Sequence, residues 1–144
     1  MVDDTRTFQM SGLYVSVLRE LAYRDDEGTL VAYFPETDFA NLRCSTICVT
    51  KSGSEVLEAG SETVREKAES HGVSVEKDGE KLFCSFTEAS SEDERDEVQY
   101  WYVGIGGNVA IVSLFVSHDR RDDPRTRRMR EAAHSLVRSI RRAD

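Results

Sequence analysis

Nine consecutive residues, Val109-Ala-Ile-Val-Ser-Leu-Phe-Val-Ser117, indicate which kind of fold this chain adopts. They are almost uninterrupted in apolar side chains and rich in β-branched ones, a composition that favours a strand. A strand with apolar residues on both faces is normally covered on both faces. We therefore expect residues 109–117 to form the central strand of a sheet, buried on both sides.

Further strands are predicted outward from this segment. Each is a short β-branched or alternating stretch bounded by turn residues such as Gly28, Pro35 and Gly79. Residues 13–23 fit either a strand or a helical turn, and both interpretations stay open. We expect an antiparallel sheet of about six strands. The predicted strands are 7–10, 29–34, 43–50, 73–77, 81–88, 97–103 and 109–117.

Two main helices are predicted to flank this sheet. The first covers residues 52–71, because Ser52 and Glu55 match a reciprocal capping box and Gly72 provides a C-terminal stop. Its apolar positions recur every four residues, and the rest of its surface is charged. The residues of the apolar stripe are Val56, Gly60, Val64 and Ala68.

The second helix is predicted at residues 123–142. Asp122 or Asp123 caps it, and Pro124 stands at the first helical position. Its apolar stripe predicts a helix that lies on the sheet, so the chain reads as an α+β fold and as a single globular domain, 1–144. The stripe consists of Met129, Ala132, Ala133, Leu136, Val137 and Ile140.

The net charge of −8 is unevenly distributed along the chain. Residues 120–144 hold nine arginines and four acids, a charge of +5, whereas residues 1–119 hold ten basic and 23 acidic residues, a charge of −13. We place Arg138, Arg141 and Arg142 in the last turn of the second helix, where cations favour the negative end of its dipole. The acidity of the rest of the chain disfavours nucleic acid as a partner and favours a basic protein.

Catalytic, metal and cofactor motifs are not recognisable in the sequence. Three cysteines without a CxxC pair or nearby histidines are a poor zinc signature, and their odd number fits buried, reduced thiols in a cytoplasm. Cys44 and Cys48 are too far apart on one strand to form a disulfide, but Cys84 could neighbour one of them across the sheet.

Two further motifs have structural explanations. His118 and Asp119 would point to opposite faces of a strand, which disfavours a catalytic pair. The glycine-rich segment 104–108 joins two predicted strands and is therefore a hairpin turn rather than a phosphate-binding loop. We expect a chain that is not an enzyme and that has no cofactor and no metal site. No apolar run approaches the length of a membrane span, and residues 1–6 lack an apolar signal region.

An aromatic run and an acidic loop are the best candidates for a binding surface. On a strand, Tyr100 and Tyr102 share one face and Trp101 takes the other. Tyrosine and tryptophan are favoured contact residues where they are accessible. The densest acidic stretch, residues 88–97, precedes them. The predicted partner-binding residues are Tyr100, Trp101, Tyr102, Glu92, Asp93, Glu94 and Asp96.

The order of the elements resembles the PsbP/DcrB-like fold group, which includes DUF1795-type bacterial proteins. The likeness rests on Tyr33-Phe34-Pro35, on the helix after Thr50, and on the ending that runs from Tyr100-Trp-Tyr-Val103 through Ile111–Phe115 to Ser139-Ile140. This resemblance implies an antiparallel sheet flanked by helices. It also implies a non-catalytic binding protein, such as a chaperone, immunity protein or adaptor of a bacterial cytoplasm.

Other functions remain as alternatives. The first is a small-ligand carrier or enzyme that uses a pocket between the sheet and the segment 11–34. The second is nucleic-acid binding through the arginines of the C-terminal helix. A homodimer also stays open. A protein partner held by an acidic or aromatic face is the function that the sequence favours.

Overall fold

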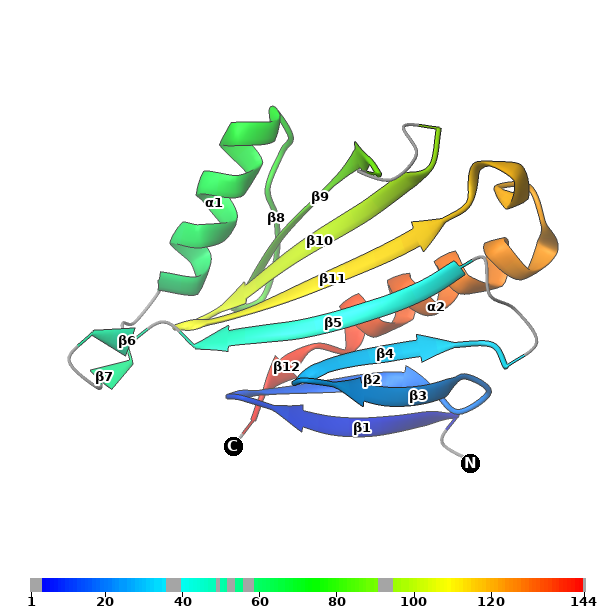
Figure 1. Ribbon diagram of the computed structural model, residues 1–144. Helices are drawn as coiled ribbons and strands as arrows, with labels where there is room; N and C mark the ends of the chain where they lie inside the picture. The colour runs from blue at the N-terminus through cyan, green and yellow to red at the C-terminus, as the bar shows by residue number, and fades with distance from the viewer. Residues whose placement is uncertain are drawn as a thin grey trace.

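A computed structural model describes residues 4–35, 40–48, 50–51, 54–55, 59–90 and 95–143. Most of its strands form one antiparallel sheet, which confirms the predicted α+β class (Figure 1). The seven strands of this main sheet are, in spatial order, β3 (Ala22–Asp26), β4 (Thr29–Tyr33), β5 (Ala40–Cys48), β11 (Asn108–Val116), β10 (Glu97–Ile105), β9 (Lys81–Ala89) and β8 (Glu76–Asp78).

Strand β11 lies at the centre of the main sheet, between β5 and β10, as its apolar sequence predicts. Its alternate residues Ala110, Val112 and Leu114 are at most 1% exposed and belong to the larger core cluster. The other face differs from the prediction, because Ile111 and Phe115 are only half-buried. The central position is therefore confirmed, whereas complete burial of both faces is wrong.

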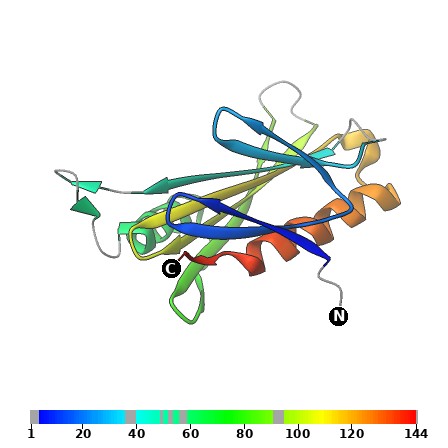
Figure 2. The same cartoon turned by 90° about the horizontal axis from the view of Figure 1, so that it is seen from below.

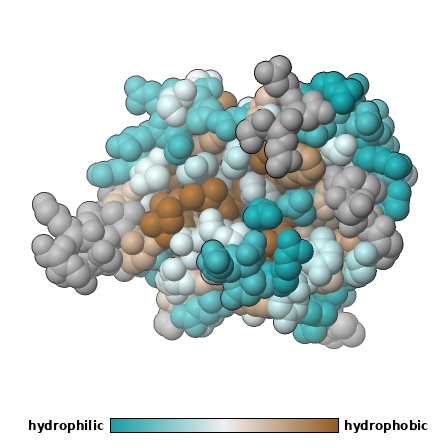
Figure 3. Space-filling view, in the orientation of Figure 1, coloured by the Kyte–Doolittle hydropathy of each residue, from teal (hydrophilic) through white to brown (hydrophobic). Residues whose placement is uncertain are grey.

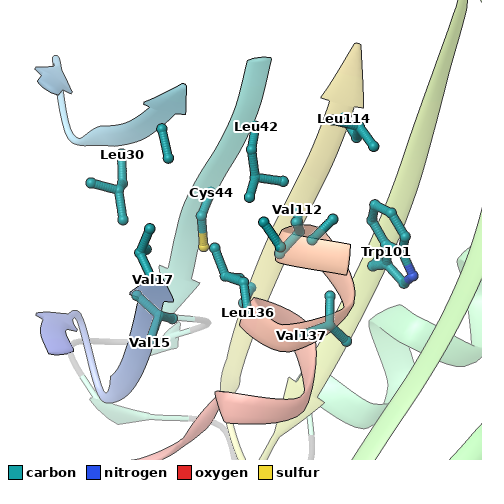
Figure 4. Close-up of a cluster of buried hydrophobic side chains, with 14 of the residues drawn as sticks. Val15, Val17, Leu30, Leu42, Cys44, Trp101, Val112, Leu114, Leu136 and Val137 are labelled. Atoms are coloured by element: carbon teal, nitrogen blue, oxygen red, sulfur yellow. The ribbon is translucent and has the colours of Figure 1, made fainter. Parts of the chain in front are cut away.

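The larger core lies between the main sheet and α2 (Pro124–Ser139). Asp123 is the N-cap of α2, and its carboxylate accepts the backbone N–H of Arg125 at 2.9 Å, so the predicted start of this helix is confirmed. Leu136 and Val137 point from α2 into the cluster of sheet side chains (Figure 4). The short 3-10 helix η1 (His118–Arg120) links β11 to α2.

A second, three-stranded sheet covers the same face beside α2 (Figure 2). It consists of β1 (Thr5–Met10), β2 (Leu13–Leu18) and β12 (Arg141–Arg142), with β2 in the middle. The segment 13–23, for which strand and helical turn were both open, therefore forms β2, a turn and the start of β3.

The end of α2 differs from the predicted boundary at residue 142. The helix stops at Ser139, because Ile140 is extended and buried and the next two residues pair with β2. Of the three arginines expected in the last turn, only Arg138 is there; Arg141 lies over the ring of Tyr14, and Arg142 pairs with Glu80. A pairing partner more than 120 residues away cannot be inferred from helix propensity.

A buried lysine completes the C-terminal end of α2. Lys81 is 7% exposed, and its ammonium group donates to the carbonyl oxygens of Val137, Arg138 and Ile140 at 3.0–3.3 Å. Desolvation lowers the pKa of Lys81. Its side chain takes the place of the missing intrahelical donors, so it connects β9 of the main sheet to the end of α2.

The opposite face of the main sheet carries α1 (Ala59–His71), which begins later than the predicted residue 52. The segment before it holds the two-residue strands β6 (Thr50–Lys51) and β7 (Ser54–Glu55), and Ser52 lies outside the described residues. The N–H of Gly60 donates to the carbonyl oxygen of Gly106 at 2.9 Å. A Cβ atom at Gly60 would stand 2.3 Å from the Asn108 carbonyl oxygen. This backbone contact with the β10–β11 turn positions the first turn of α1.

Candidate functional site

The face of the main sheet that carries α1 is only half covered. Helix α1 packs against β9, β10 and part of β11, and no described helix lies over β4 and β5 on this side (Figure 1). We call the uncovered area the open face. Its side chains come from β5, β10 and β11, and they are Arg43, Ile47, Val98, Tyr100, Ile111, Ser113 and Phe115.

The strand register explains why these side chains lie together. Across the sheet, Ser113 of β11 stands opposite Arg43 on one side and Tyr100 on the other. Residues directly opposite in neighbouring strands point to the same face, so alternate residues of three strands form cross-strand rows. The adjacent row places Phe115 beside Val98. The open face is thus formed by every second residue of three neighbouring strands.

The open face combines apolar and polar side chains and is accessible. Ile47 is 50% exposed, which is unusual for a large aliphatic side chain, and Ile111, Phe115 and Tyr100 are half-buried. Hydrophobic residues gather in a band below α1 (Figure 3). A shallow hollow of about 350 Å³ lies beside them, lined in part by Arg43, Tyr100 and Phe115.

An aromatic cluster joins the open face to α1. Phe86 lies between Tyr100 and Tyr102, with ring centroids at 5.5 and 5.8 Å. The ring of His71, at the end of α1, stacks on Phe86 at 3.6 Å. The ammonium group of Lys67 lies 5.3 Å from the centroid of Tyr102. The border of the open face is therefore a packed aromatic wall with cations at its edge.

His71 is held by acceptors on both ring nitrogens. Its Nε2 lies 2.8 Å from Glu88 Oε1 and its Nδ1 lies 3.0 Å from the carbonyl oxygen of Lys67. Only the imidazolium form can donate at both positions. The hydrogen bond with Glu88, followed by the one with Lys67, raises the pKa of His71.

The structure separates the residues that the sequence placed in one binding surface. Tyr100 and Tyr102 share the α1 side of the sheet, whereas Trp101 is 3% exposed and meets His134 of α2 edge-on at 5.5 Å. Trp101 is therefore a core residue, which corrects its inclusion as a contact residue.

The acidic part of the predicted surface is only partly visible. Asp96 accepts the backbone N–H of His118 at 2.6 Å, so its carboxylate fixes the start of η1. Glu92, Asp93 and Glu94 lie outside the described residues. The sequence analysis missed Ile111 and Phe115, because a nearly continuous apolar strand indicates burial and does not show which of its two faces lacks cover.

The cysteines and histidines do not converge on a reactive centre among the described residues. Cys44 lies in the larger core and Cys84 on the α1 side, on strands separated by β10 and β11, and all three cysteines are free. Burial raises the pKa of Cys44 to about 12, far from that of a reactive thiolate. The described residues contain no group of three or more metal-ligating side chains. Nor do they include a helix with the length and apolarity that a membrane span requires.

The fold has counterparts among solved structures. A crystallised protein from Bacteroides thetaiotaomicron matches with a TM-score of 0.72 and 15% identity over 100% of this chain, which spans 50% of that protein's length. PsbP from the cyanobacterium Synechocystis matches with a TM-score of 0.43 and 12% identity, over 99% of this chain and 94% of PsbP. PsbP, the namesake of the fold group named in the sequence analysis, is among the solved structures that match. The likeness to the Bacteroides protein concerns the fold alone. No family model and no curated protein matches the sequence.

Proposed function

We propose that this protein is a non-catalytic binding module of a bacterial cytoplasm, of the chaperone, immunity or adaptor type. Its open face holds a basic amphipathic helix of a partner protein. The observation that carries this proposal is the part of the main sheet beside α1, where Ile47 is half exposed, Ile111 lies diagonally across from it, and Phe115 lies further along the same strand as Ile111.

The width of the open face suits one helix. Three neighbouring strands, β5, β11 and β10, span about 10 Å between the outer two, and an α-helix with its side chains is about 10 Å across. On the other half of the same face, α1 already occupies such a position, with Val64 and Ala68 buried against the sheet. A partner helix beside α1 would complete a layer that the chain itself leaves half filled.

The charges around the open face favour a basic partner. Helix α1 carries Glu62, Glu66 and Glu69 on its solvated surface, while Arg43 on the open face lies 4.0 Å from Asp26 of β3. Complementary charge at the rim accelerates encounter and disfavours wrong partners, while the apolar centre supplies affinity.

The proposal is tested with a synthetic peptide of about 18 residues, long enough to form a helix, built from Leu on one face and Lys on the other. Backbone amide shifts of the labelled protein are followed during titration. We expect saturable shifts centred on Ile47, Ile111 and Phe115, and weaker binding of the same peptide with Glu in place of Lys.

A matched pair of variants locates the contact. Ile111→Asn removes an apolar side chain from the open face and should weaken binding about tenfold. His134→Asn changes an exposed residue on the opposite side of the molecule and should leave affinity unchanged. Shifts confined to α2 would show that the open face is not the binding surface, and equal binding of the acidic peptide would contradict a preference for a basic partner.

A further inference from the structure

A pocket lies at the free edges of the two sheets, on the side of the main sheet opposite the open face. It has a volume of about 550 Å³, within the range of small-molecule sites. Strand β1 is an edge of the small sheet and β3 is an edge of the main sheet, and the pocket is the space where these sheets diverge. The pocket lies in the region between the sheet and the segment 11–34, for which the sequence analysis kept a small-ligand site as an alternative.

The walls of the pocket are apolar and aromatic. Phe8 and Met10 reach it from β1, where the register pairs them with buried residues of β2. From the main sheet come Tyr23, 44% exposed, and Leu30, 7% exposed. The rings of Phe8 and Tyr23 meet edge-to-face at 4.9 Å. Phe8, Met10 and Tyr23 keep part of their apolar surface accessible, whereas Leu30 is almost fully buried at the base of the pocket.

Asp25 is the single charged residue among those that line the pocket. Its Oδ1 accepts the N–H of Gly28 at 2.8 Å, which fixes the carboxylate in the β3–β4 turn. No described lysine or arginine forms an ion pair with Asp25, whereas its neighbour Asp26, on the opposite face, lies 4.0 Å from Arg43. The pocket therefore combines an apolar wall with an oriented, uncompensated negative charge.

A cationic side chain of this protein already lies at the aromatic wall of the pocket. The guanidinium carbon of Arg6 lies 5.3 Å from the centroid of the Tyr23 ring. The faces of aromatic rings attract positive charge, so an ammonium group near Tyr23 and Asp25 gains from both. Arg6 would therefore compete with such an ammonium group for the Tyr23 ring.

We propose that this pocket binds a small organic cation, in which an amine is attached to an aromatic or branched apolar body. The apolar body packs against Phe8, Met10 and Leu30, and the ammonium group faces Asp25. Because Asp25 is exposed, its charge should contribute only about a two- to fivefold preference, and the apolar walls supply the remaining affinity.

The test uses three probes with the same ring and different charge: phenethylamine, 2-phenylethanol and 3-phenylpropionate. Amide shifts of the labelled protein are followed at pH 7 and constant ionic strength. We expect saturable shifts in residues 8–11 and 23–28, with the amine bound about two- to fivefold more tightly than the alcohol and the carboxylate bound most weakly.

Three variants separate charge recognition from simple apolar binding. Asp25→Asn keeps an acceptor for the Gly28 N–H and should abolish the preference for the amine without changing the affinity for the alcohol. Asp26→Asn, whose side chain lies on the other face, should change neither. Arg6→Gln should strengthen amine binding, because it removes the competing cation.

Two results would overturn the proposal. One is the lack of saturable shifts in residues 8–11 and 23–28 with all three probes. The other is a preference for the amine that survives Asp25→Asn. Because the pocket and the open face lie on opposite sides of the main sheet, neither result bears on the binding of a partner helix.

Discussion

The two faces of the main sheet are covered in different ways. On one face, α2 and the small sheet bury a continuous core that extends from Leu13 in β2 to Trp101 in β10. On the other, α1 covers a separate cluster built around Val64, Leu82 and Phe86, and the open face continues beside it. The apolar side chains of the α2 face are buried in a continuous core, whereas part of those on the α1 face are accessible.

The two helices also attach differently. Helix α2 presents a wide apolar stripe that includes Met129 and Leu136, each 1% exposed. Helix α1 buries only small side chains, such as Val64 and Ala68, and relies on the close backbone contact at Gly60. We infer that the α2 face contributes most of the free energy of unfolding and that α1 is the cover more easily displaced.

The strongest test compares the same truncation on both faces. Leu136→Ala should lower the free energy of unfolding by about 2–5 kcal/mol, because it opens a cavity in the larger core. Leu82 lies in the smaller cluster and is 8% exposed, so Leu82→Ala should lower the free energy of unfolding by clearly less than Leu136→Ala. Urea denaturation followed by circular dichroism measures both. Equal losses would contradict the division between a folding face and an accessible face.

A smaller effect is expected where α1 meets the β10–β11 turn. Gly60→Ala should cost about 1–3 kcal/mol, because its Cβ would clash with the Asn108 carbonyl oxygen at 2.3 Å. In the Gly60→Ala variant, amide hydrogen exchange should accelerate more in α1 than in α2. Ser61→Ala, one residue further along the same helix, is the control and should leave the exchange in α1 nearly unchanged. Uniform acceleration in both helices would show that α1 does not open separately.

The smallest effect is a pH dependence of the α1 face. The contact with Glu88 raises the pKa of His71 above its ordinary 6.5, so protonated His71 favours the folded state. This contribution is complete below the unfolded pKa and is lost as the pH rises through the folded pKa.

The measurement is the urea midpoint between about pH 5.5 and 8.5, together with the NMR titration of the His71 ring. Glu88→Gln should lower the pKa of His71 and flatten this pH dependence. A His71 pKa at or below 6.5 in the unaltered protein would contradict the assigned contact.

Local patterns were sufficient for the elements that contact the core along their whole length. The stripe of α2 and the Asp123–Pro124 start predicted that helix because burial and capping agree there. The Ser52–Glu55 motif predicted too early a start for α1, because the helix is positioned by a backbone contact between Gly60 and Gly106. Such contacts depend on the assembled sheet and leave no local pattern.

The candidate surface was predictable only in part. Alternation correctly placed Tyr100 and Tyr102 on one face and Trp101 on the other. It could not show that Trp101 would lie in the core, nor that Ile111 and Phe115 would be only half-buried by the described residues. Whether a given face is covered depends on where a distant helix packs, and the residues of the strand do not encode that position.

The pairing of β2 constrains the order in which this protein can fold during its synthesis. It pairs with β1 on one side and with Arg141–Arg142 on the other, and the N–H of Ala143 donates to the carbonyl oxygen of Gly12. The hairpin of β1 and β2 can form early, but its second edge stays open until residue 142 has left the ribosome. During that time one edge of β2 has unpaired backbone groups, which another chain could pair with.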